Sequence, residues 1–177
     1  MTKALKTIAN LLAQILLERM DENMYVLRTF KRPGSNRRLV NEILQIIDSV
    51  TITWFTKEVY EYVPYDLKFQ DVILLIKKRK IIGFIMYTCL DGKITMTLMA
   101  IHKDYQGKGY GTLMYRKLEE NMKNKGFTNI MLQTIPPDVN ANYEKTIKFW
   151  INQGFEITRR YNELWDHGAI EMEKKIV

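Results

Sequence analysis

The stretch that decides the fold is residues 101–118, which read IHKDYQGKGYGTLMYRKL. An apolar strand ends at its start, and an amphipathic helix begins after the glycines at 107, 109 and 111. The first turn of a helix leaves backbone N–H groups without partners and carries the positive end of the helix dipole. Glycines there remove the Cβ atoms that would keep an anion off those amides, and they permit positive φ values. With Lys108 as an added cation, the stretch predicts a phosphate-binding turn.

Two common phosphate loops do not match this spacing. The Walker pattern G-x-x-x-x-G-K-S/T is absent from the sequence. The dinucleotide fingerprint would need glycines at 107, 109 and 112, but position 112 is Thr, and no acidic residue follows at a strand end about 20 residues later. A glycine-rich strand-to-helix turn is also found as an ordinary tight connection, so that interpretation stays open beside the phosphate site.

The turn itself has a third pattern, because Gln106 to Gly111 read Q-x-x-G-x-G. This pattern resembles the coenzyme motif of the GNAT superfamily, the acyl-CoA-dependent N-acyltransferases. The helix ending at Gly126, the apolar strand Ile130–Leu132 and the helix ending in Phe149–Phe155 also follow in that family's order. The resemblance covers about residues 24–177. It implies an α/β (α+β) fold with a mixed, mostly antiparallel sheet of six to seven strands flanked by helices.

The resemblance also implies a binding site for acetyl-CoA, used as a co-substrate. In that family the amides of the motif hold the coenzyme A pyrophosphate, and the pantetheine arm pairs with the backbone of the fourth strand, which splays away from the fifth. The residues that the resemblance assigns to the coenzyme are Met99, Ala100, Ile101, Gln106, Gly107, Lys108, Gly109, Tyr110, Gly111, Thr112, Asn142 and Phe149. Helix-start Asn142 is also a plain N-cap candidate.

The implied reaction is direct attack of an unprotonated primary amine on the acetyl thioester, aided by proximity and by a backbone N–H on the oxyanion. The general base stays open, because residues 93–98 read KITMTL and lack the carboxylate that many relatives have there. A water chain and four other side chains remain as alternatives: Glu144, Glu163, Asp166 and His167. His102, by contrast, is predicted to be a turn residue.

The general acid is a second open position. Relatives commonly use the tyrosine of an F-Y pair on the last helix, whereas this chain has Phe149 and Trp150, and an indole N–H is no proton source at ordinary pH. Tyr143 lies two helical turns earlier on the same face and is our candidate acid. Packing is an equally good explanation for this tyrosine. A non-catalytic CoA-binding regulatory module is therefore the alternative to an enzyme.

The acceptor amine has no specific signature in the sequence. Residues 161–168 mix aromatic and acidic side chains, and Tyr60, Tyr62 and Tyr65 lie near a predicted helix, so these segments are candidates for an acceptor wall. They are equally typical of a polar hairpin and of ordinary packing. The acceptor is a small-molecule or peptide amine, and we expect a monomer or a homodimer.

The composition limits the other functional classes. The chain has 177 residues, is 46% hydrophobic and carries a formal charge of +7, which fits one folded domain. Its cations fall in three clusters, one of them around the phosphate turn, and we expect no nucleic-acid partner. No apolar run is long enough to span a membrane, and no cleavage site follows the N-terminal stretch, so we expect no membrane partner and a cytoplasmic protein.

The single cysteine and the two histidines carry little chemistry. Cys89 cannot form an internal disulfide and is predicted to be a small buried hydrophobic residue within a strand. The histidines and the cysteine do not have the spacing of a zinc site, so no metal is expected.

Hydrophobic periodicity divides the chain into an amphipathic helix over residues 1–22 and a single domain over residues 23–177. The helix needs a partner surface, either its own core or a second copy of the chain. Strands are expected at 25–30, 72–76, 81–90, 94–101, 127–133, 155–161 and 168–176, with an Asp91–Gly92 hairpin turn after the third. Helices are expected from Ser35 or Asn36, over 54–62 ending before Pro64, over 109–125 and from about 140–142.

Overall fold

The computed structural model describes residues 24–90 and 92–176. Seven strands form one sheet in the order β1-β2-β3-β4-β5-β7-β6, with only the β4–β5 pair parallel among the described pairings. The strands are β1 (Tyr25–Phe30), β2 (Asp71–Lys77), β3 (Lys80–Leu90), β4 (Lys93–Ile101), β5 (Asn129–Thr134), β6 (Glu156–Tyr161) and β7 (Ala169–Lys175). The helices are α2 (Arg37–Trp54), α3 (Lys57–Asp66), α4 (Tyr110–Lys123) and α5 (Tyr143–Asn152), with 3-10 turns η1 (Pro33–Ser35) and η2 (Lys103–Tyr105).

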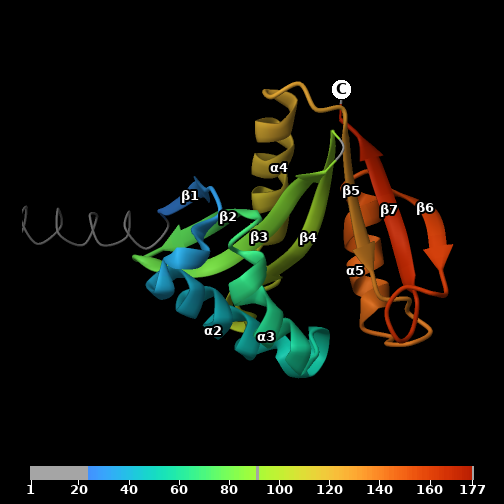
Figure 1. The fold of residues 1–177 in the computed structure, drawn as a ribbon, viewed down its shortest axis with the longest axis horizontal. Helices are drawn as coiled ribbons and strands as arrows, with labels where there is room; N and C mark the ends of the chain where they lie inside the picture. Colours follow the sequence, from blue (N-terminus) through green and yellow to red (C-terminus); the bar gives the residue numbers. More distant parts are fainter. Residues whose placement is uncertain (1–23, 91, 177) are drawn as a thin grey trace, which may run out of the picture.

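Helices cover both faces of this sheet (Figure 1). One apolar cluster joins α2 and α3 to one face of strands β2 to β4, and a second joins α4 and α5 to the opposite face. The second cluster continues into β5 and β7, so it connects the two halves of the sheet. The mixed, mostly antiparallel sheet flanked by helices confirms the predicted fold.

The helix α2 forms the base of the first cluster. Asn36 precedes it and its side chain accepts a hydrogen bond from the Leu39 N–H at 3.1 Å, which is the N-cap arrangement predicted for this position. The apolar stripe that the sequence predicts is buried, with Ile43 and Ile47 fully excluded from solvent. Helix α2 therefore packs against one face of strands β2 to β4, on the left in Figure 1.

A β-bulge interrupts β4 at Thr97. In the pairing of β4 with β3, Met96 and Leu98 lie opposite consecutive β3 residues, so Thr97 is an extra residue in β4. Bulges bend a strand and increase its local twist. The Thr97 hydroxyl, which faces solvent, donates to Oε1 of Gln70, which precedes β2.

The bulge coincides with the point where the sheet divides. Strand β4 pairs with β5 only over Ile94–Met96, which lie opposite Ile130–Leu132. Beyond Met96, residues 98–101 stay paired with β3, and none of residues 97–101 pairs with β5. Figure 1 shows β4 and β5 diverging toward their carboxyl ends. The splay between the fourth and fifth strands is thus present in the fold.

The end of α4 is attached to the far half of the sheet by a charged cluster. The Glu119 carboxylate lies 2.7 Å from Nζ of Lys174 in β7 and 3.3 Å from Nζ of Lys123. Partial burial opposes ionisation of Glu119, but the hydrogen bonds and the charge of Lys174 outweigh it and lower the pKa of this carboxyl. The cluster keeps α4 against β7.

Two predicted helix boundaries are wrong. Trp54 ends α2 and does not begin the second helix, which starts at Lys57. That second helix, α3, continues through Pro64 to Asp66. Pro64 lies in the last turn, where the missing N–H leaves only one carbonyl without its usual partner, and the Leu67 N–H closes the turn on the Val63 carbonyl at 3.0 Å.

The prediction that Cys89 is buried is also wrong, because its side chain is exposed. Strand β2 pairs with β3 only as far as Tyr87, so the end of β3 projects past its neighbour and loses cover on that side. The predicted N-terminal helix over 1–22 and Asp91 of the predicted hairpin turn lie outside the described residues, while Gly92 has the positive φ, 76°, that such a turn requires.

Candidate functional site

The chain between β4 and α4 forms a turn with exposed backbone donors. Gly107 and Gly109 have φ values of 72° and 79°, in the left-handed region that favours glycine. Helix α4 begins without a side-chain cap, and its first bond from this turn runs from the Leu113 N–H to the Gly109 carbonyl at 3.1 Å. Within the described part of the chain, no backbone carbonyl accepts from the N–H groups of residues 107–112. These donors and the helix dipole together can satisfy an anion.

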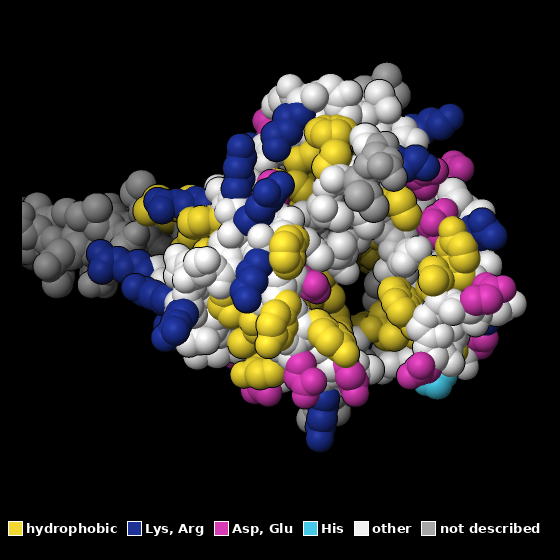
Figure 2. Space-filling model, in the orientation of Figure 1, with side chains coloured by type: hydrophobic (Ala, Val, Ile, Leu, Met, Phe, Trp, Pro, Cys, Tyr) yellow, Lys and Arg dark blue, Asp and Glu magenta, His cyan; other side chains and the backbone are white. Residues whose placement is uncertain are grey.

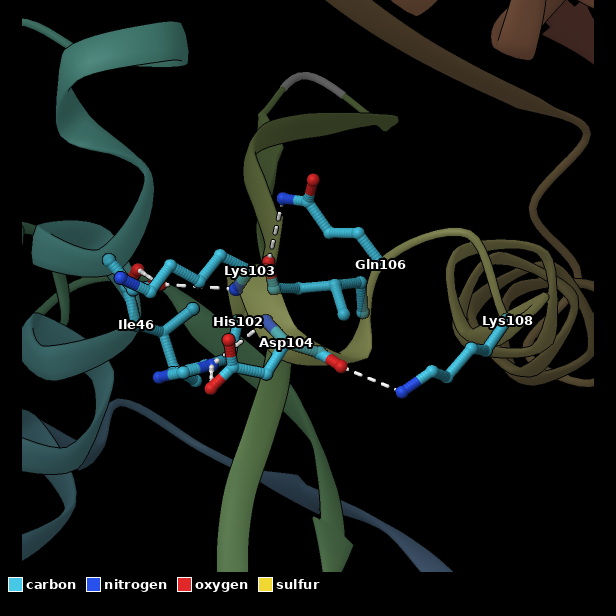
Figure 3. A network of polar contacts seen from close by, with 8 residues as sticks. Ile46, His102, Lys103, Asp104, Gln106 and Lys108 are labelled. Carbon is cyan, nitrogen blue, oxygen red and sulfur yellow. Dashed lines mark hydrogen bonds and ion pairs between the residues drawn. The ribbon is translucent and has the colours of Figure 1, made fainter.

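Side chains hold this turn in place (Figure 3). The Gln106 amide Nε2 donates to the Ile101 carbonyl at 3.0 Å, which closes the loop on the end of β4. Lys108 Nζ donates to the Asp104 carbonyl at 2.7 Å, so this cation lies beside the turn and stabilises its backbone. The Asp104 N–H donates to His102 Nδ1 at 3.3 Å, and His102 is therefore a turn residue, as predicted.

The side chain of Tyr110 leaves the turn in another direction. Its hydroxyl accepts from Lys77 Nζ at 2.9 Å, and its ring packs edge-on against Tyr25 of β1 at 6.3 Å. Any contact of Tyr110 with a ligand in the turn would therefore run through its backbone N–H.

Gly111 brings three elements into contact. A Cβ at this position would lie 3.4 Å from Met99 Cε of β4 and 3.4 Å from the Phe149 ring of α5. The next residue, Thr112, accepts from Gln153 Nε2 at 3.3 Å through its hydroxyl, which ties the start of α4 to the end of α5. Met99, Gly111 and Phe149, which are far apart in the sequence, therefore meet in one place.

The unpaired part of β4 lies beside this contact. Ala100 and Ile101 are buried, on opposite faces of the strand, and Met99 is half-buried. Figure 2 shows a hollow between the two halves of the molecule with hydrophobic side chains around it. Apart from the Ile101 carbonyl, which accepts from Gln106, the backbone groups on this side of β4 are free to pair with an extended ligand, as strands do with added peptide chains.

Tyr143, the first residue of α5, connects the two halves of the molecule. Its hydroxyl donates to the Trp54 carbonyl at the end of α2, and the two rings pack edge-on with their centroids 5.7 Å apart. Burial raises the pKa of this phenol above its usual value, so it is protonated at neutral pH. Trp150 packs in the core instead, edge-on against Tyr115 and Phe155.

Asn142 does not cap α5 with its side chain. It is exposed, and its backbone N–H donates to the Asn140 side chain at 3.0 Å. The alternative base residues are exposed as well, on α5 and in the β6–β7 loop: Glu144, Glu163, Asp166 and His167. None of them has a described contact with the turn at 107–112.

Sequence reasoning missed two features of this region. One is the Thr97 bulge, which the sequence does not signal, because apolar and polar residues alternate regularly from Ile94 to Leu98. The other is Trp54, whose carbonyl and ring contact Tyr143 across 89 residues of sequence. Within residues 24–90 and 92–176, no group of three His, Cys, Asp or Glu side chains could hold a metal ion, and no helix is long and apolar enough to cross a membrane.

Residues 40–155 match the Acetyltransferase (GNAT) family, which is more than half of the chain and includes the turn and the divided strands. The chain belongs to the GNAT acetyltransferase family. No match was found among curated protein sequences. The family assignment confirms the resemblance seen in the sequence and supports an acetyltransferase with acetyl-CoA as its acetyl source.

Solved GNAT structures share this fold at low sequence identity. A GNAT-family protein from Desulfovibrio desulfuricans superposes with a TM-score of 0.75 at 12% identity, covering 87% of this chain and 100% of its own. The ribosomal-protein-S18-alanine N-acetyltransferase of Escherichia coli gives 0.69 at 15%, covering 86% and 94%. The PaiA N-acetyltransferase of Thermoplasma acidophilum, solved with coenzyme A, gives 0.63 at 16%, covering 86% and 99%.

Substitution of the glycines tests whether the turn depends on their positive φ values. We expect Gly107→Ala and Gly109→Ala each to lower the free energy of unfolding by about 1–2 kcal/mol, because a Cβ is strained at these positive φ values. Gly111→Ala is the matched control, since Gly111 has no positive φ and a Cβ there meets its neighbours at ordinary van der Waals distance. Urea denaturation measures all three. Equal losses in the three variants would contradict a turn built on left-handed glycines.

Proposed function

We propose that this chain is an N-acetyltransferase that transfers the acetyl group of acetyl-CoA to a primary amine by direct attack on the thioester. The observation that carries the proposal is the group of unpartnered N–H donors at residues 107–112, next to the unpaired edge of β4 at residues 97–101. One feature suits a pyrophosphate and the other an extended amide-bearing arm. The residues present fit coenzyme A.

In this proposal the chain holds the coenzyme mainly through its backbone. The amides from Gly107 to Thr112 bind the pyrophosphate, with Gln106 and Lys108 fixing the shape of the turn. The pantetheine amides pair with the backbone of Met99, Ala100 and Ile101. Phe149 and Met99 lie beside Gly111 and form the apolar wall where the pantetheine arm enters the gap between β4 and β5. Asn142, exposed at the start of α5, has the weakest structural support among the predicted contacts.

Catalysis then depends on position and on charge stabilisation. An unprotonated amine attacks the thioester carbonyl, a tetrahedral oxyanion forms, and its collapse gives the amide and releases the CoA thiolate. In this proposal a free N–H on the divided edge of β4 donates to the oxyanion, and fixing both reactants between β4 and β5 supplies much of the rate. Strand β4 has no carboxylate to accept the amine proton. The proton therefore passes to another base, either an exposed side chain or a chain of water molecules.

Tyr143 is the proposed acid for the thiolate. Burial raises the pKa of its phenol, so the proton is present at neutral pH. To serve, the hydroxyl has to turn from the Trp54 carbonyl to the sulfur. The same contact supports the second candidate function, a CoA-binding regulatory module without turnover, because a hydroxyl committed to Trp54 is a structural link between α2 and α5.

The coenzyme site is tested by titrating acetyl-CoA into the purified chain by calorimetry. We expect saturable binding in the micromolar range, about −8 kcal/mol. Gly109→Glu should abolish it, because the new carboxylate repels the pyrophosphate. Gly109→Ala is the control for backbone strain, and thermal unfolding shows that each variant is folded. No binding by the wild-type chain would refute both the transferase and the regulatory module.

The acid is tested with Tyr143→Phe, which removes only the hydroxyl. If Tyr143 protonates the thiolate, kcat for any accepted amine should fall by about 10²–10⁴-fold while the affinity for acetyl-CoA is kept. The kcat of the wild-type chain should also decline at alkaline pH as the phenol ionises, and the variant should not show this decline. An unchanged kcat with a lowered free energy of unfolding would instead assign Tyr143 a purely structural role.

A further inference from the structure

The helix α3 has an outward face that the acetyl-transfer proposal leaves unused. Tyr62 and Tyr65 are 61% and 64% exposed, and Phe69, just after the helix, is 75% exposed. Positions 58, 62 and 65 are four and three residues apart, so they share one side of α3, opposite the buried Val63. Soluble proteins rarely expose several large apolar side chains side by side unless the patch binds a partner.

Carboxylates border these rings. Glu58 begins the same stripe and Glu61 lies beside it, and neither has an ion-pair partner among the described residues. Figure 2 shows hydrophobic and acidic side chains close together in the lower part of the view, where Figure 1 places α3. These two carboxylates lie on a chain with a formal charge of +7, and Lys57 and Lys68 flank them in the sequence.

One cation already occupies part of this surface. Lys68 Nζ lies over the ring of Tyr65, 5.0 Å from its centroid. An ammonium or guanidinium group above a tyrosine ring is attracted by the π face, and neighbouring carboxylates strengthen that attraction. The contact shows that the ring face of Tyr65 has the geometry to hold a cation, which Lys68 of the same chain supplies here and which a partner's cation would replace.

The length of the stripe indicates the kind of partner. From position 58 to position 65 the helix rises about 10 Å, at about 1.5 Å per residue, and Phe69 follows in the turn beyond its end. An extended chain covers that distance with about three residues at about 3.3 Å each. Because the face is a convex helix surface and small molecules bind in concave pockets, a short peptide segment fits it better than a metabolite does.

We propose that the outward face of α3, formed by Glu58, Glu61, Tyr62, Tyr65 and Phe69, docks a lysine- or arginine-rich segment of another polypeptide. The rings receive the cationic groups and their apolar stems, and the two glutamates supply charge complementarity. The surface is separate from the turn at 107–112, so the inference does not depend on acetyl transfer.

The test is fluorescence anisotropy with fluorescein-labelled hexalysine as the probe, hexaglutamine carrying the same label as its control, and the full chain without acetyl-CoA. We expect saturable binding of hexalysine only, although the net charge of the protein opposes it. Tyr62→Ala/Tyr65→Ala and Glu58→Gln/Glu61→Gln should each weaken it by about tenfold or more. Glu120→Gln/Glu156→Gln removes the same charge from α4 and β6 and should change the affinity by less than about twofold.

Each other result overturns the proposal. Equal binding of both probes would remove the role of the cation, and equal affinities of the three double variants would remove the role of α3. A loss with the tyrosine pair alone would indicate an apolar partner, and no binding by the wild-type chain would leave the face without the proposed occupant. Since the assay contains no acetyl-CoA, its failure is distinct from a failure of acetyl transfer, and thermal unfolding shows that each variant is folded.

Discussion

The parting of β4 from β5 is the constraint on which the rest of the structure depends. The two strands pair over only three residues each, and the Thr97 bulge turns β4 away just where that pairing ends. A continuous parallel ladder would satisfy the backbone of residues 97–101 internally and leave nothing for a ligand to pair with. The division gives the sheet an internal edge, which a packed domain tolerates only where water or a ligand can reach it.

The divided sheet needs other contacts to hold its halves together. The apolar cluster under α4 and α5 crosses the divide, and Lys174 of β7 attaches the far half to Glu119 of α4. Tyr143 of α5 also reaches the end of α2, a helix of the opposite face, through a hydrogen bond and an edge-on ring contact with Trp54. These contacts keep the start of α4 and its glycine turn at a fixed place beside the unpaired edge. The proposed coenzyme site is therefore a product of packing as much as of the motif.

Much of this could be predicted from the sequence, because local rules govern the elements involved. Gly107 and Gly109 adopt the positive φ values expected of a phosphate turn, and Asn36 caps α2 as its position suggests. The failures depend on tertiary context. The sequence predicts a helix that ends before Pro64, whereas α3 continues to Asp66, and it predicts a buried Cys89, whereas β2 begins opposite Tyr87 and leaves Cys89 uncovered. The bulge at Thr97 and the Trp54–Tyr143 contact link distant segments, so no local pattern announces them.

Amide hydrogen exchange with and without acetyl-CoA tests the central account most directly. We expect the coenzyme to slow exchange in two segments: at the N–H groups of residues 97–101 that face away from β3, and in the turn at residues 107–112, where the described residues offer no acceptor. The edge strand β6 at the far end of the sheet should exchange at the same rate in both states. Protection confined to other elements, or none in these two segments while acetyl-CoA is bound, would contradict it.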